Sequence, residues 1–304
     1  MTDRAREFGL FIDGLRLERD ISREDLCDNI MSLSQYKRYL RGDTSIPNNR
    51  LVQIAERLKF SINDIHFLFG KKHNDEYYKI YEIYRLIKIN EFKKAFDLSQ
   101  IVKNDIIVSE YNILFLDFCL LRVQHALKMV SDIHVLELYS RLINFPNCAD
   151  NDSFNMVEIS VLIQIVTISS NMGNLEPTNV MYRILASKSF TYSNSGDSSF
   201  LPSIYSSLSS ILGVQEQHEK VLELSQKGID YCISQETSNA LAHLFLFNSL
   251  GHLYTGNREA ALLSVKKCFM QLFIEDKPEK LKAFNATFEN QFKMKLEDLI
   301  DFKK

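Results

Sequence analysis

The sequence contains few residues that interrupt helices. Ten Gly and five Pro are spread over 304 residues, and so few turn-forming residues favour helices over a sheet with many tight turns. Hydrophobic residues make up 45% of the chain, which is enough to fill packed cores. A chain of this length is expected to form two domains. We therefore predict an all-α protein with two domains.

Motifs of nucleotide-binding and metal-dependent enzymes are missing. No GxGxxG, GxxxxGK[ST] or HExxH occurs, and the five Cys and seven His are scattered without a CxxC pair or ligand spacing. The sequence therefore predicts no metal site, no cofactor and no disulfide framework. Since no catalytic residue can be singled out, we expect that the protein is not an enzyme.

Signals for export or membrane insertion are also missing. The chain begins with polar and charged residues, unlike a signal peptide. Its longest apolar stretch, residues 106–123, includes Glu110 and Asp117 and so does not resemble a membrane span. Unpaired cysteines are typical of the cytosol. We expect a cytoplasmic protein without a membrane partner.

Residues 22–58 carry the most specific pattern in the chain. Ser22 is placed to cap a first helix, and Ser32 with Gln35 has the spacing of a capping box for a second. Gly42 follows the second helix, where a residue with positive φ is favoured. Only Met31 would remain for the turn, so we predict a helix-turn-helix with a steep crossing. A further helix is predicted to begin at Pro47, in its first turn.

The second of these helices has two contrasting faces. Its inward side is aromatic and apolar, with Tyr36, Tyr39 and Leu40. Its outward side follows the i, i+3, i+4, i+7 spacing, with Ser34, Lys37, Arg38 and Arg41. Cations bind phosphates or guanine edges, and short polar groups such as that of Gln35 reach base edges. This face predicts binding in the DNA major groove; an ordinary solvated helix face is the alternative.

Residues 5–69 resemble the Xre/Cro-type helix-turn-helix family. The residues that match are Gly9, Ile12, Leu15, Arg16, Ser22, Leu26, Ser32, Gly42, Pro47, Ile54, Ala55 and Leu58, and residues 60–65 look like the fifth helix of that family. Leu40 departs from the family, which often has Glu there. The resemblance implies that Ser34, Gln35, Lys37 and Arg38 face bases, and that Ser22, Arg23 and Asn48 lie near phosphates.

The charge of the N-terminal part is modest. Residues 1–72 hold 13 Lys+Arg against 11 Asp+Glu, a net charge of +2, and the remainder carries −5. Each phosphate contact adds salt-sensitive affinity. We therefore expect a homodimer that binds two half-sites of double-stranded DNA.

The rest of the chain is a succession of predicted helices. We predict a DNA-binding domain over residues 1–70, a linker over 71–74 and a helical domain over 75–304. Helices are expected near residues 77–89, 91–103, 107–125, 127–144, 153–172, 175–190, 199–213, 215–233, 239–255, 257–274 and 278–302. Residues 161–168 could pass for a strand, but the neighbouring periodicity favours a helix. Weak internal similarity among residues 90–102, 216–228 and 250–260 resembles degenerate tetratricopeptide repeats, which implies a helical solenoid with a concave face.

The whole architecture resembles the Rgg–PlcR–PrgX group of peptide-sensing regulators. That resemblance implies a transcription regulator for quorum sensing, in which a short signalling peptide binds the concave face and changes how the dimer binds DNA. Side chains that could pair with a peptide backbone or floor an apolar pocket are Asn112, Asn155, Gln164, Tyr205, Phe245, Asn248 and His252.

Three alternatives stay open. The first is that each of these side chains is structural, with Asn155 as a helix cap, Gln164 as a satisfied buried amide and Tyr205 as core. The second is a scaffold or phage- or antitoxin-type regulator whose repeats bind another protein. The third concerns the C-terminal apolar residues, which could form a dimer seam or cap the solenoid; they are Phe284, Phe288, Phe292, Leu296 and Leu299.

Overall fold

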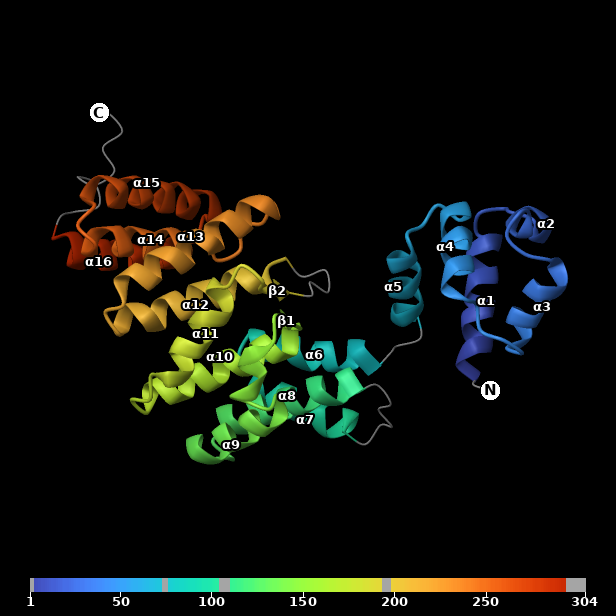
Figure 1. Cartoon of the computed structure of the whole chain (residues 1–304), viewed down its shortest axis with the longest axis horizontal. Coiled ribbons are helices and arrows are strands. Elements are labelled where there is room, and N and C mark those ends of the chain that lie inside the picture. Colours follow the sequence, from blue (N-terminus) through green and yellow to red (C-terminus); the bar gives the residue numbers. More distant parts are fainter. Residues whose placement is uncertain (1–2, 73–75, 104–109, 193–197, 294–304) are drawn as a thin grey trace. The chain divides into compact units, whose positions relative to one another are not determined.

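The computed structural model describes residues 3–72, 76–103, 110–192 and 198–293. These residues are almost entirely helical (Figure 1), which confirms the predicted all-α class. Two short strands, β1 (Ser153–Phe154) and β2 (Thr191–Tyr192), pair in parallel and were not predicted. The chain divides into two compact units, Met1–Cys119 and Leu120–Lys304, and each is described by itself.

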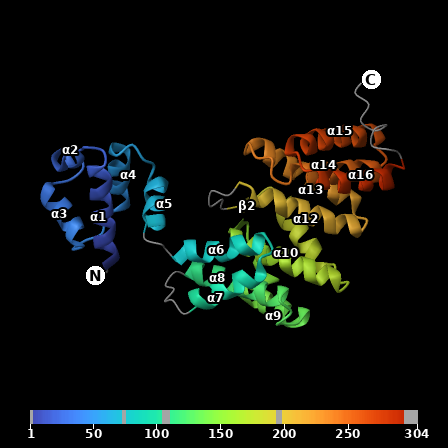
Figure 2. The same ribbon diagram turned by 180° about the vertical axis from the view of Figure 1, so that it is seen from behind.

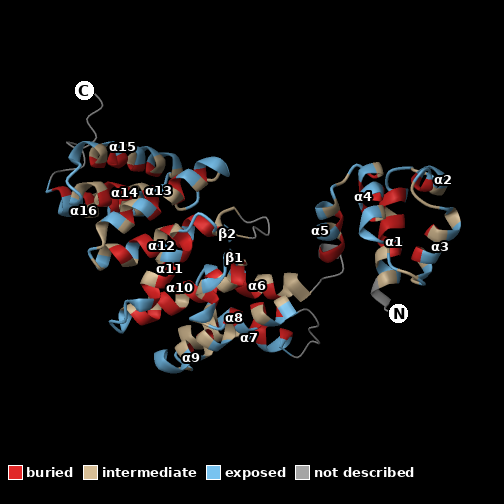
Figure 3. Ribbon diagram, in the orientation of Figure 1, coloured by how far each residue is buried: buried red, intermediate tan, exposed pale blue. Residues whose placement is uncertain are grey.

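Five helices at the start of the chain enclose one hydrophobic core. They are α1 (Asp3–Leu17), α2 (Arg23–Cys27), α3 (Leu33–Arg41), α4 (Asn48–Arg57) and α5 (Ile62–Lys72). The core runs from Phe11 to Phe69, with Ile12, Tyr36 and Ile54 fully buried at its centre. Figure 3 shows buried residues on the inner sides of α1, α3 and α4. The predicted five-helix module is present.

The predicted caps of α2 and α3 are confirmed. The Ser22 hydroxyl accepts a hydrogen bond from the Asp25 amide at 2.9 Å, and the Ser32 hydroxyl accepts one from the Gln35 amide at 3.2 Å. Gly42 follows α3 with φ +76°, in the left-handed region that glycine adopts without strain. Local side-chain chemistry therefore fixes where these helices begin and where α3 ends.

Three details of this region differ from the sequence prediction. Helix α2 ends at Cys27, so the turn spans four residues rather than Met31 alone, and Asn29 takes a positive φ of 57° within it. The Gln35 side chain donates to the Thr44 hydroxyl at 3.3 Å instead of completing the capping box. Pro47 is the N-cap of α4, one residue before its first turn.

Three helices follow in the first unit. They are α6 (Glu76–Lys88), α7 (Phe92–Val102) and α8 (Glu110–Ala126), and the division between the units falls within α8. Rings from α6 and α8 meet in an aromatic cluster, in which the Tyr84 and Phe115 centroids lie 5.5 Å apart. The predicted linker at 71–74 stays a prediction, because α5 extends to Lys72 and residues 73–75 lie outside the described residues.

The second unit continues with eight α-helices in its described part. They are α9 (Asp132–Leu142), α10 (Met156–Asn171), α11 (Glu176–Ala186), α12 (Phe200–Val214), α13 (His218–Ser234), α14 (Leu241–Tyr254), α15 (Arg258–Glu275) and α16 (Pro278–Phe292), with a 3-10 turn at Asn147–Asp150. Residues 161–168 lie in α10, as predicted. Both views in Figures 1 and 2 place α12 to α16 side by side.

The packing order of these helices is that of a repeat array. The two helices of each successive pair contact one another. These pairs are α10 with α11, α12 with α13, and α14 with α15. The first helices also contact one another, α10 with α12 and α12 with α14, and the second helices α11 and α13 do the same. Stacked pairs of this kind build a solenoid in which first helices share one face. The predicted repeat architecture is confirmed.

The end of the array bears on one of the open alternatives for three of its five residues. Phe284, Phe288 and Phe292 of α16 are buried against α14 and α15 of the same chain. These three residues therefore cap the array rather than form an exposed dimer seam. Helix α16 ends at Phe292, short of the predicted 302, and Leu296 and Leu299 lie outside the described residues. Helices α9 and α11 are likewise shorter than predicted.

Helices α1 and α3 approach so closely that their contact excludes a side chain at Gly9. A Cβ atom built there would lie 2.4 Å from the Tyr39 carbonyl oxygen, whereas one at Gly14 of the same helix would meet nothing within 4 Å. We expect Gly9→Ala to lower the free energy of unfolding by roughly 1–3 kcal/mol, as overpacking does. Gly14→Ala should instead raise it by about 0.5–1 kcal/mol, since Ala favours helix.

Thermal unfolding followed by circular dichroism compares the two glycine variants with the parent chain. Equal melting temperatures for Gly9→Ala and Gly14→Ala would contradict the close approach of α1 to α3.

Candidate nucleic-acid interface

The outward face of α3 is polar, cationic and accessible. Its predicted residues Ser34, Lys37, Arg38 and Arg41 are all exposed. Tyr36 and Tyr39, on the opposite side, are 0% and 1% exposed. The helix therefore presents three cations and a hydroxyl outward while two tyrosines anchor it. Gln35 lies between the two sides, half-buried, with its amide nitrogen bound to Thr44.

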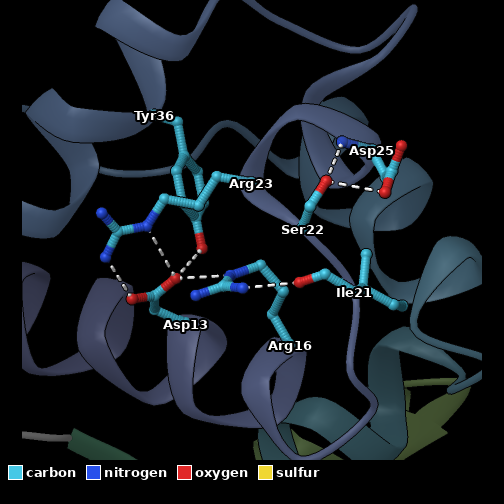
Figure 4. Close-up of polar contacts among 7 residues, drawn as sticks. All are labelled: Asp13, Arg16, Ile21, Ser22, Arg23, Asp25 and Tyr36. Carbon is cyan, nitrogen blue, oxygen red and sulfur yellow. Dashed lines mark hydrogen bonds and ion pairs between the residues drawn. The ribbon is translucent and has the colours of Figure 1, made fainter.

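A buried carboxylate holds α3 against the helices before it (Figure 4). Asp13 of α1 accepts hydrogen bonds from the Tyr36 hydroxyl at 2.9 Å and from Arg16 Nε at 2.7 Å. The Arg23 guanidinium donates to its second oxygen at 2.8 Å. Arg16 also donates to the Ile21 carbonyl at 2.5 Å, which ties down the loop before α2. One side chain thus links α1, α2 and α3.

The electrostatics of this cluster keep Asp13 ionised. Burial alone would raise the pKa of Asp13, but hydrogen bonds from Arg23, Arg16 and Tyr36 outweigh it and lower the pKa to about 2. Burial and the nearby Asp13 carboxylate raise the pKa of Tyr36, so its hydroxyl stays a donor. Two arginines and one carboxylate leave a net positive charge beside the N-terminus of α2.

Two arginines of α4 donate hydrogen bonds to α3 and to the end of α2. Arg50 donates to the Tyr39 hydroxyl at 2.8 Å. Arg57 donates to the carbonyl oxygens of Asp25 and Asp28, which lie at the C-terminal end of α2 and have no partner within the helix. Arginines of α4 therefore fix the turn that follows α2 and the C-terminal half of α3.

The residues predicted to lie near phosphates are in different situations. Ser22 and Asn48 are exposed, at the start of α2 and of α4. Arg23 is held by Asp13, yet 42% of its side chain stays exposed. Arg41 pairs with Asp43 at 2.9 Å, an exposed pair that costs little to separate. The DNA-facing roles of all eight residues stay predictions.

The second unit contains an open groove of about 740 Å³. We refer to it as the groove; it is lined by Thr167, Ser203, Ser206, Ser207, Ser210, Ile211, Ser238, Asn239, Ala240, His243, Phe247, Glu275, Lys277 and Lys280. Most of these belong to α10, α12 and α14, the first helices of the stacked pairs. Ligand sites typically enclose roughly 300–1,000 Å³, so the groove is large enough for a small ligand.

None of the residues predicted for a peptide site lines this groove. Asn155 forms the capping box of α10 with Glu158, and Tyr205 is 6% exposed within the core. Asn248 is buried and bonded to Ser264 and Ser225, whereas Asn112 binds Glu76 in the first unit. Asn155 is thus a helix cap and Tyr205 a core residue, as the structural alternative predicts.

The three remaining candidates are half-buried. They are Gln164, Phe245 and His252. Gln164 lies one turn before Thr167 of α10, close to the groove lining. Phe245 packs at the edge of the C-terminal core, with the Lys267 ammonium 5.8 Å from its ring. Peptide-binding roles for the predicted residues stay predictions.

Sequence reasoning missed the groove residues and the Asp13 cluster. Asp13 and Arg16 are three residues apart on one helix, a spacing that predicts an ion pair, but their link to Tyr36 spans 23 positions. The serines at 203, 206, 207 and 210 do follow one helix face. That signal was available and points to a polar lining on α12.

Comparisons with known proteins agree with this picture. Residues 14–65 match the helix-turn-helix family model. A search of curated protein sequences finds no match. Solved structures match nearly the whole chain, although at low sequence identity.

PlcR of Bacillus thuringiensis, solved with the peptide PapR7 and DNA, is 16% identical with a TM-score of 0.71, over 92% of this chain and 99% of that one. ComR of S. thermophilus, solved with DNA and its signalling peptide ComS, is 15% identical with a TM-score of 0.62, over 94% and 99%. The SHP pheromone receptor Rgg2 of Streptococcus dysgalactiae is 12% identical with a TM-score of 0.63, over 93% and 99%. The chain shares the fold of these regulators, as its sequence predicts.

Among the described helices, none combines the length and the apolarity that a membrane span requires.

Replacing Asp13 tests whether this carboxylate positions α3. Asp13→Asn leaves the buried Arg16 without its counter-ion, and we expect the free energy of unfolding of the helix-turn-helix to fall by roughly 3 kcal/mol. Asp20→Asn, at an exposed position, should change it little. Amide hydrogen exchange of α3 in the full chain measures this difference. Equal protection in the two variants would refute the role of Asp13.

The lowered pKa of Asp13 predicts that the stability of the helix-turn-helix depends on pH. The folded pKa of Asp13, about 2, lies below the ordinary unfolded value of about 3.9. Its contribution to stability is therefore complete above pH ~4 and is lost as the pH falls towards 2. The protection factors of α3 amides, which correct for the pH dependence of intrinsic exchange, should fall over that interval in the parent chain, and less so in Asp13→Asn.

Proposed function

We propose that this protein is a homodimeric, DNA-binding transcription regulator of the quorum-sensing type, controlled by a short signalling peptide that binds in the groove of the second unit. The proposal that the protein binds DNA rests on the exposed cationic face of α3, which the Asp13 cluster and α4 hold in place. Such a regulator acts on the chromosome, in the cytoplasm, and needs no catalytic residue.

The geometry of α3 suits the major groove of DNA. A groove about 12 Å wide admits one α-helix, and the exposed residues Ser22 and Asn48 at the starts of α2 and α4 are the ones expected to contact phosphates. Lys37 and Arg38 supply charge or guanine contacts, and Ser34 offers a small hydroxyl to base edges. Arg41 adds a fourth contact once it leaves Asp43.

Two copies are required because one module carries little positive charge. The net charge of residues 1–72 is only +2, and affinity grows with the number of phosphates that a protein contacts. A dimer doubles those contacts and matches two half-sites about one helical turn apart. Regulation then consists in a ligand that favours one arrangement of the two modules over another.

The proposal that a peptide controls the protein is supported by the groove and by the fold that the chain shares with PlcR and ComR. The groove offers hydroxyls and an amide along the first helices of the array, and such groups pair with an extended peptide backbone. PlcR and ComR, which share the fold, were solved with the peptides PapR7 and ComS. The alternative, a protein partner on the array, is an outcome of the peptide test below.

A double substitution on α3 tests DNA binding without knowledge of the operator. We expect Lys37→Ala with Arg38→Ala to weaken binding to a random-sequence duplex and to reduce the salt slope of log K by about 2, one for each lost phosphate contact. Lys93→Ala, which removes an exposed cation from α7, is the control. Fluorescence anisotropy over a salt series measures both effects. An unchanged slope in the double variant would disprove this interface.

A bulky residue in the groove tests peptide binding. Native mass spectrometry of the chain purified from its own host should detect a short bound peptide, and Ser207→Phe should abolish it because the ring obstructs the groove along α12. Ser234→Phe, at an exposed position on α13, should retain the peptide. A bound protein instead of a peptide would support the scaffold alternative.

A further inference from the structure

The lining of the groove changes in character from one end of the array to the other. Its α10 and α12 side is neutral and rich in hydroxyls, with Thr167, Ser203, Ser206, Ser207, Ser210 and Ile211. Every charged residue of the lining comes from the opposite side, where α15 ends and α16 begins. We refer to these three residues, Glu275, Lys277 and Lys280, as the charged end.

Two ammonium groups and one carboxylate at the charged end face the groove, a net charge of +1 within the lining. The exposed Asp276 and Glu279 flank Lys277 in the sequence and lie outside the lining. Lys280 Nζ binds the Glu275 carboxylate at 2.7 Å, so these two residues neutralise one another. Burial would raise the pKa of Glu275, but the Lys280 hydrogen bond and Lys277 outweigh it and lower the pKa, so the carboxylate is ionised at neutral pH. Lys277 is exposed, and its ammonium makes no hydrogen bond or ion pair with any residue that the structure describes. Its ammonium is therefore available to a ligand in the groove.

His243 lies at the same end without adding charge. Its ring packs edge-on against Phe284 of α16, with centroids 4.9 Å apart. Burial lowers the pKa of His243, and the nearby Lys280 ammonium lowers it further. The imidazole is therefore neutral near pH 7 and contributes a hydrogen-bonding group beside the two lysines.

The neutral part of the groove is suited to a peptide backbone. The hydroxyls of Ser206, Ser207 and Ser210 form no hydrogen bond with the described residues. Asn239 donates through Nδ2 to the Ser203 hydroxyl at 2.8 Å, which fixes the amide and leaves its oxygen as an acceptor. Ile211 and Phe247 are the large apolar side chains of the lining. Donors and acceptors therefore outnumber apolar surfaces along this part.

We infer that the groove binds its peptide with a carboxylate of the peptide anchored at the charged end by Lys277 and the backbone lying along the hydroxyls of α12. This inference rests on the proposed function and adds the charge of the ligand. The anchor is the peptide's own C-terminal carboxylate or an acidic side chain, since both present the same group. Lys277 is the residue that selects it, because Lys280 is already paired with Glu275.

A competition between acidic and esterified peptides tests the anchor. The probe is a mixture of short peptides from an elastase digest of a bacterial lysate, one half of which is methyl-esterified so that every carboxylate becomes a neutral ester. The full-length chain captures peptides from the equal mixture, and mass spectrometry quantifies each pair. We expect the free acids to be enriched about fivefold over their esters, as for a partly exposed ion pair.

Two lysine variants make the test specific. The Lys277→Gln variant should lose the preference for free acids and should still capture esters as well as the parent chain does. Retained capture of esters shows that Lys277 anchors a carboxylate and is not needed for the structure of the groove. Lys282→Gln, an exposed position on α16 outside the lining, should keep the preference. The sequences of the retained acids then show whether the terminal or a side-chain carboxylate is the anchor, and either result supports the inference.

The failures are distinguishable. Equal capture of acids and esters by the parent chain overturns the carboxylate anchor and leaves the peptide function intact. A preference that persists in Lys277→Gln also overturns it. Capture of no peptide from either half overturns the anchor and, with it, the peptide half of the proposed function.

Discussion

The contact of one buried carboxylate with three helices determines how this protein presents its cationic helix. Asp13 binds Tyr36 of α3, Arg16 of α1 and Arg23 at the start of α2. A short helix such as α3 is unstable by itself, so its pose depends on what it packs against. With Asp13 ionised, both the tilt of α3 and the position of α2 are fixed in the free protein, so the DNA binding that we propose would lose little energy in ordering them.

In the second unit, the same helices contribute to the hydrophobic core and to the lining of the groove. Its core-facing residues on α14 and α16 stack the pairs, and the residues left over on the first helices line the groove. Helix α14 thus stabilises the array through Ala242 and Leu246 and contributes His243 and Phe247 to the groove lining. Because the array is built from repeated contacts, a ligand that bridges α12 and α16 affects the stacking of every pair between them.

Local chemistry explains which features could be predicted from the sequence. The caps at Ser22 and Ser32 and the glycine at position 42 depend on neighbours three or four residues away, so their spacing was sufficient. The length of α2 was not predictable, because Arg57 and the left-handed Asn29 terminate it through contacts distant in sequence or unusual in backbone. The alternation of helices in the second unit was predictable from periodicity, whereas the exact ends of α9, α11 and α16 were not.

The groove was harder to predict, because α14 is apolar on nearly all sides and its sequence does not reveal which face the neighbours cover. Asn248 looked like a ligand residue, but it is buried among Ser225 and Ser264. His243 packs against Phe284 and also lines the groove. Only the serine pattern of α12 carried a signal that needed no knowledge of the neighbouring helices.

The most direct measurement of the central claim is chemical footprinting of the lysines with and without duplex DNA. Acetylation of the full-length chain compares Lys37 of α3 with Lys59 and Lys93, all three of which are exposed in the free protein. If the outward face of α3 binds DNA, a duplex protects Lys37 and leaves Lys93 reactive, with Lys59 little affected. If Lys37 reacts as fast with saturating DNA as without it, α3 is not the DNA-binding helix.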